Sequence, residues 1–116
     1  MAEAKATVRD IGLPARKVRL VADMIRGRKV SEARSALQFT QKASAPIIRK
    51  LLDSACANAE NAAAEQQERI DTDDMVVSRI VVNEGRTLHR FRPRARGSAS
   101  PIRKRSSHVE IEIQGS

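Results

Sequence analysis

Residues 85–109 contain eight Lys and Arg side chains and no Asp or Glu, and this imbalance constrains the fold more than any other feature of the sequence. Eight like charges repel one another unless an outside anion neutralises them. The stretch also has few large apolar side chains, so it cannot pack firmly against the rest of its own domain. We therefore expect it to leave the folded body as an arm that binds a polyanion.

The arm is expected to be extended. Arginines fall at every second position of Arg90–Arg96, which places them on one face of a strand and would scatter them around a helix. Phe91 and the other intervening residues then lie on the opposite face. Pro93 and Pro101 also oppose a helix. Over residues 85–97 such an arm spans roughly 40 Å at about 3.3 Å per residue.

The remaining composition suits one small core. A length of 116 residues is typical of a single domain, and we expect a body over about residues 1–84 and 106–116 with the arm over about 85–105. The apolar residues are mostly aliphatic, without Trp or Tyr. No apolar stretch approaches the ~18 residues of a membrane span, and the first residues lack a signal-peptide pattern. We expect a cytoplasmic protein without a membrane partner.

Three amphipathic helices are predicted before the arm. The first spans residues 14–26. The second begins at Ser31, its predicted N-cap, and ends before Phe39. The third begins at about Ser44 and frays over residues 62–67.

Two strands are predicted on either side of the arm. A polar turn at residues 71–74 precedes the β-branched run at residues 76–82. Apolar and polar side chains alternate over residues 109–114, which indicates a strand with one buried face. These two strands are expected to form one antiparallel hairpin, whose arms extend beyond the globular body.

No catalytic or metal-binding constellation stands out. The five glycines are too dispersed for a nucleotide-binding loop. His89 and His108 lack Cys or carboxylate neighbours at zinc-ligand spacing, residues 71–74 lack the rest of a calcium loop, and Cys56 is expected to be a buried core residue. We expect no cofactor, metal or small-molecule substrate. The enzyme alternative is a ribonuclease with His89 and His108 as general base and acid, and it requires the two imidazoles to converge.

The cations of the arm suit phosphate recognition, because arginine donates paired hydrogen bonds from a planar fork and stacks on bases. Phe91 either stacks on an unpaired base or packs against its cross-strand partner. A narrow arm without a recognition helix suits folded RNA better than a DNA major groove, although charge alone does not separate the two. The eight cations are Arg86, Arg90, Arg92, Arg94, Arg96, Arg103, Lys104 and Arg105.

Five sequence blocks resemble, in order and spacing, the bacterial large-subunit ribosomal protein L twenty-two family. The resemblance covers roughly residues 7–114. The blocks are KVRLVADMIRGRKV at 17–30, ANAE at 57–60, VNEG at 82–85, RFRPRARGSA at 90–99 and IRKRSSH at 102–108.

The resemblance implies an α+β fold, with three helices packed on a small antiparallel sheet and a long protruding basic β-hairpin. It implies a structural constituent of the large ribosomal subunit, without enzyme activity, that binds several domains of 23S rRNA and supports subunit assembly. The hairpin tip would line the nascent-peptide exit tunnel, near the nascent polypeptide and ribosomal protein L four. The alternative is a non-ribosomal nucleic-acid chaperone or nucleoid-type protein with the same basic arm.

Carried over residue by residue, the resemblance implies three groups of contacts. The arm would bind rRNA through its eight cations and His89. The tunnel-facing tip would comprise Arg92, Pro93, Arg94, Ala95, Arg96 and Gly97, and the rRNA contacts of the body would be Arg16, Lys17, Arg19, Arg26 and Lys29.

The chain departs from the family pattern at a few positions. Arg86 stands where the family usually has Pro, and His89 where Lys is commoner. Ser98 replaces the usual Arg after the tip glycine, which removes a phosphate contact. Leu13 replaces the usual Ser before Pro14, so a capping hydroxyl is absent there.

Overall fold

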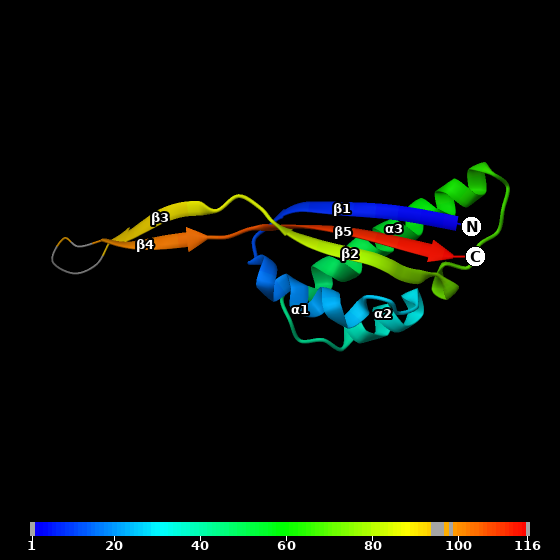
Figure 1. The fold of residues 1–116 in the computed structure, drawn as a ribbon, viewed down its shortest axis with the longest axis horizontal. Coiled ribbons are helices and arrows are strands. Elements are labelled where there is room, and N and C mark those ends of the chain that lie inside the picture. Colours follow the sequence, from blue (N-terminus) through cyan, green and yellow to red (C-terminus); the bar gives the residue numbers. More distant parts are fainter. Residues whose placement is uncertain (1, 94–96, 98, 116) are drawn as a thin grey trace.

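The computed structural model describes residues 2–93, 97 and 99–115, and at residues 2, 90–93 and 99–103 it describes the backbone alone. Figure 1 shows a body of helices and a sheet from which a hairpin projects to one side. Both chain ends lie at the opposite end of the body from the hairpin. In chain order the elements are β1 (Ala2–Ile11), α1 (Ala15–Ile25), α2 (Val30–Gln38), α3 (Ala45–Glu65), the 3-10 helix η1 (Thr72–Asp74), β2 (Val76–Glu84), β3 (Leu88–Pro93), β4 (Ala99–Lys104) and β5 (Ser107–Gly115).

The body sheet has three antiparallel strands in the order β1-β5-β2. Ile111 of the central strand lies opposite Ala6 of β1 and Ile80 of β2. The two strands predicted beside the arm are confirmed as β2 and β5. The expected α+β class, with three helices on a small antiparallel sheet, is confirmed as well.

β1 was not predicted. Its inward positions include Ala4 and Ala6, whose short side chains carry a weak strand signal. Pairing with β5 and packing against α3 place them in the core. The side-chain amide of Asn58 on α3 also donates to the carbonyl of Lys5 at 2.8 Å. Tertiary contacts therefore hold this strand where local propensity does not.

The alternation predicted for the last strand sets the position of the core. Val109, Ile111 and Ile113 of β5 are fully buried, whereas the residues between them are half-buried on the other face. The helices lie on the buried face of the sheet (Figure 1). Cys56 of α3 is only 2% exposed, which confirms it as a core residue, and burial raises the pKa of its thiol.

The predicted start of the second helix is wrong. Lys29 occupies the N-cap position of α2, and Ser31 lies inside the first turn. Lys29 forms a β-bridge with Val76, and the Val30 N–H donates to the carbonyl of Met75 at 2.8 Å. Because the strand entrance supplies this acceptor, the helix begins without a serine cap.

The predicted fraying of the third helix is wrong too. α3 continues to Glu65, and Ala63 is buried against the body. Alanine has the highest helix propensity, so this stretch remains helical once one side is covered. Gln67 then adopts a left-handed conformation (φ 56°), and the Glu68 N–H donates to the carbonyl of Ala63 at 2.8 Å, which closes the helix end.

The acidic segment after α3 is a structural turn, as predicted. The Asp71 carboxylate accepts the Asp73 N–H at 3.0 Å, and this cap starts η1. Arg34 of α2 donates to Asp73 at 3.0 Å and to Asp53 of α3 at 3.1 Å. The segment therefore ties α2 to α3 through one arginine.

Candidate nucleic-acid interface

The arm is an antiparallel hairpin of β3 and β4, in which Leu88 lies opposite Lys104 and Pro93 opposite Ala99. The backbone up to Pro93 is extended, as the arginine spacing predicts. Arg90, Arg92 and Arg103 lie in these paired strands, and their side chains are outside the described part. The tip residues Arg94, Ala95 and Arg96, and the neighbouring Ser98, lie outside the described residues.

The hairpin does not continue unbroken into the body sheet. Between the two sheets lies a joint formed by residues 85–87 and 105–106, which we call the root of the arm. The Gly85 N–H donates to the carbonyl of Ser106 at 2.9 Å, and the Ser106 hydroxyl donates to the carbonyl of Arg86 at 2.6 Å. A Cβ at Gly85 would lie 2.6 Å from Ser106 Oγ. A side chain at this position would therefore push the Ser106 hydroxyl away from the Arg86 carbonyl that it contacts.

His108 holds the end of β1 beside the root. Its Nδ1 accepts the Asp10 N–H at 3.0 Å, and Asp10 has a left-handed backbone (φ 57°) at a bulge in the pairing of β1 with β5. The two histidines of the ribonuclease alternative line different hollows. Within the described residues, no group of His, Cys, Asp and Glu is arranged to hold a metal ion.

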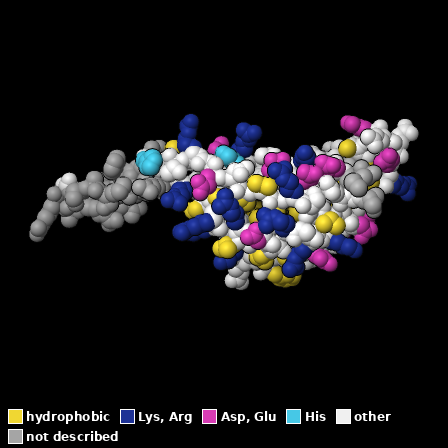
Figure 2. All heavy atoms as spheres, viewed as in Figure 1, with side chains coloured by type: hydrophobic (Ala, Val, Ile, Leu, Met, Phe, Trp, Pro, Cys, Tyr) yellow, Lys and Arg dark blue, Asp and Glu magenta, His cyan; other side chains and the backbone are white. Residues whose placement is uncertain are grey.

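Cations surround the root and face solvent. Figure 2 shows dark blue side chains gathered where the arm leaves the body. Arg16, Arg86, Lys104 and Arg105 are exposed, and none of their guanidinium or ammonium groups forms an ion pair or hydrogen bond with any residue that the structure describes. Four uncompensated charges close together favour binding of an anion.

Two hollows flank the root, and Arg105 and Ser106 line both. The first has a volume of about 340 Å³ and is also lined by Arg16, Glu84 and His89. The second has a volume of about 510 Å³ and is also lined by Asp10, Arg86, Leu88 and Lys104. Both lie where the arm meets the body, so an anion bound there contacts both parts.

The outer face of the body sheet contrasts with the root, because two of its cations, Lys5 and Arg79, are paired with carboxylates. Lys5 lies 3.9 Å from Glu112, and Arg79 lies 3.5 Å from Glu110. A hydrogen bond between Glu3 and Glu112 raises the pKa of Glu3 and lowers that of Glu112. Positive charge on this face is therefore largely compensated.

Two of the five predicted body contacts have structural roles. Arg19 of α1 donates from Nε and Nη2 to the carbonyl of Val82 at 3.2 and 3.0 Å. Arg26 donates to the carbonyl of Ile80 at 2.8 Å and pairs with Asp23. These arginines clamp α1 against β2.

The other three predicted body contacts are Arg16, Lys17 and Lys29. They are exposed and form no ion pair within the part of the chain that the structure describes. These three cations are therefore available to an outside anion.

Replacing Arg19 by Met is expected to lower the free energy of unfolding by about 1 kcal/mol, because two hydrogen bonds to a partly buried carbonyl are lost. Lys17→Met is the matched control, since it removes the same charge from the same helix without breaking an internal bond. Urea unfolding of both variants measures the difference. Equal stability would show that the clamp does not contribute.

Two exposed arginines were missed by the sequence reasoning. Arg9 of β1 lines a hollow with Asn83 and His108, and no strand was predicted there. Arg28 lines a shallow hollow with Phe39, whose side chain is 80% exposed. The position of Arg9 depends on the pairing of β1 with β5, whereas Arg28 belongs to the basic run at residues 26–29, which is visible in the sequence.

Among the described residues, no helix combines the length and the apolar character that a bilayer crossing requires.

Comparison with known proteins gives a consistent result. A family model described as "Ribosomal protein L22p/L17e" matches residues 6–114. Large ribosomal subunit protein uL22 of Pediococcus pentosaceus is 50% identical over 110 residues, which cover 95% of this chain and 89% of that protein. The protein of the same name from Ligilactobacillus salivarius is 53% identical, with 95% and 91% covered. That from Lactobacillus gasseri is 49% identical over 113 residues, with 97% and 92% covered.

Proposed function

The chain belongs to the ribosomal protein L22p/L17e family, and on that premise we propose that it is anchored in the large ribosomal subunit by its root and its arm. It is a structural, non-enzymatic protein of the large subunit. The finer proposal is that the root and the arm bind 23S rRNA, that this binding supports subunit assembly, and that the tip lines the exit tunnel. Its expected location is the ribosome in the cytoplasm.

The observation that carries this proposal is the set of uncompensated cations around the root. Each phosphate that a Lys or Arg neutralises releases counterions, so binding is strong and depends on salt. Phosphates that neutralise the arginines of the arm also remove the repulsion between these like charges. This mechanism needs shape and charge and no catalytic group.

The proposed division of the chain is a body of about residues 1–84 and 106–116 and an arm of about residues 85–105. Ribosomal protein L four, the nascent polypeptide and several domains of 23S rRNA are the proposed neighbours. We assign the tip to residues 92–97. The proposed rRNA contacts are His89 and the eight cations of the arm, together with Arg16, Lys17 and Lys29 of the body and the donors of Arg19 and Arg26 that the clamp leaves unused.

Sedimentation of the tagged protein from a cell lysate, through a high-salt gradient, tests the proposal. We expect one copy per large subunit, and we expect ribonuclease to abolish this co-migration. Release at moderate salt with far less than one copy per subunit would contradict it. That result, together with comparable binding to duplex DNA, would identify a general nucleic-acid chaperone or nucleoid protein instead.

A further inference from the structure

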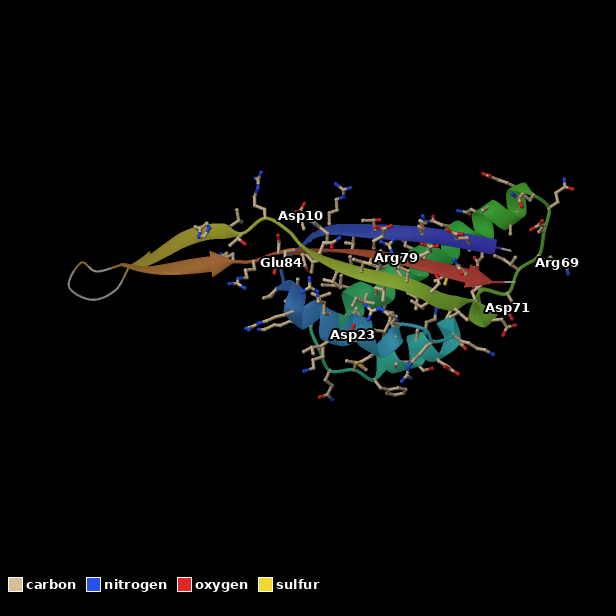
Figure 3. All side chains as sticks on the ribbon, viewed as in Figure 1. Asp10, Asp23, Arg69, Asp71, Arg79 and Glu84 are labelled. Atoms are coloured by element: carbon tan, nitrogen blue, oxygen red, sulfur yellow. The ribbon has the colours of Figure 1, made fainter. Side chains whose placement is uncertain are left out.

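The first hollow at the root is formed by three separate parts of the chain. Arg16 comes from α1, Glu84 from the end of β2, Thr87 and His89 from the outgoing side of the arm, and Arg105 and Ser106 from its return. Figure 3 labels Glu84 where β2 leaves the body toward the arm. A group bound here contacts the helical layer of the body and both segments of the root, residues 85–87 and 105–106, at once.

The lining of this hollow selects an anion. Two arginines from different elements reach it, and neither has a charged partner among the described residues. Thr87 and Ser106 add hydroxyl groups. Guanidinium groups bind phosphate oxygens in pairs, and a volume of about 340 Å³ accommodates a phosphate with its linking sugar atoms.

We propose that this hollow holds a single RNA backbone phosphate, which Arg16 and Arg105 bind together. The inference rests on the proposed function and deepens it, because it assigns one phosphate to two arginines from separate parts of the chain. The bound phosphate then acts as a bridge between α1 and the return side of the arm. It couples docking of the body to the direction in which the arm leaves it.

Replacing Glu84 tests the proposal through an effect on RNA binding that is opposite to the effect of replacing either arginine. Its carboxylate also lines the hollow and forms no ion pair with the described residues. A negative charge beside a bound phosphate opposes binding. Glu84→Gln is therefore expected to strengthen RNA binding severalfold at low salt.

The main experiment measures the salt dependence of binding of the full-length protein to a 23S rRNA transcript. Arg16→Gln and Arg105→Gln are each expected to reduce the slope of log K against log salt by about 0.7–0.9, the value for one phosphate contact. The double variant is expected to lose no more than either single variant, because both arginines hold the same phosphate. Neither side chain has an internal partner in the described structure, so the thermal unfolding midpoints should not change.

Arg69→Gln is the matched control. Arg69 is exposed and has no ion pair with the described residues, and Figure 3 places it at the end of the body opposite the arm. We expect it to leave the slope unchanged. If the double variant reduced the slope by twice as much as a single variant, the two arginines would not share one phosphate. If the single variants reduced the slope no more than Arg69→Gln does, the hollow would not bind a phosphate.

A titration with inorganic phosphate separates the two proposals. We expect phosphate to shift the backbone amide resonances of Arg16, Thr87 and Arg105 in the wild-type protein, and to shift them much less in the double variant. Shifts at these amides in a protein that does not bind rRNA would support the hollow and reject the proposed function. Selective rRNA binding by the wild type, without such shifts, would support the function and reject the hollow.

Discussion

Replacing Ile111 by Ala is expected to lower the free energy of unfolding by about 2–5 kcal/mol, because it leaves a cavity in a close-packed core. Ile111 is fully buried at the centre of the three-stranded sheet, between Ala6 and Ile80. Its alanine neighbour has little side chain with which to fill the gap. A small domain is stable by about 5–15 kcal/mol in total, so this change is a large share.

Ile111→Val is a smaller change at the same position, so its loss of stability can be compared with that of Ile111→Ala. Valine removes one methyl group and is expected to cost about 0.5–1.5 kcal/mol. Urea unfolding of the full chain, with an unchanged dependence on denaturant, measures both values. A loss below about 0.5 kcal/mol for Ile111→Ala would show that this face of the sheet is not the core.

Replacing Arg92, Arg94 and Arg96 together by Ala is expected to weaken rRNA binding on the order of a hundredfold at 0.1 M salt, because three phosphate contacts are lost. The slope of log K against log salt is expected to fall by about 2.1–2.7, which is three contacts at 0.7–0.9 each. Filter binding over a range of salt concentrations measures both quantities. Subunit assembly should decline in parallel.

The matched control is Lys42, Arg49 and Lys50 replaced together by Ala. These cations are exposed, lie near or on α3, and have no ion pair within the described residues. The control removes the same net charge, so a purely nonspecific attraction would weaken equally in both variants. Unfolding of both variants should match the wild type, because the core of the body is untouched. Unchanged RNA binding in the arm variant would reject the arm as an anchor.

Much of the fold follows from local pattern. Helical periodicity placed α1 correctly, and alternation in β5 gave both the strand and its buried face. β1 escaped prediction because small alanines carry little strand propensity. The Ser31 cap was wrong because Met75, distant in sequence, supplies the acceptor for the first turn of α2.

The candidate interface also has one part that the sequence predicted and one part that depends on the tertiary structure. The arm was found from the charge of residues 85–109, which is a property of the sequence alone. Arg19 and Arg26 could not be separated from Arg16 by sequence, since all three fall on the polar side of the helix predicted over residues 14–26. Only the packing of α1 on β2 brings backbone carbonyls within reach of the first two.

The sequence by itself determined that this protein has a basic extended arm, an aliphatic core and the blocks of its family. Charge, periodicity and spacing are properties of short stretches of the sequence, so they can be recognised without knowledge of the fold. Tertiary structure alone decided where the arm meets the body, and hence that Arg16 and Arg105 line one hollow. Their separation in the chain exceeds 80 residues, and only the path of β2 and β5 through the shared sheet brings them together.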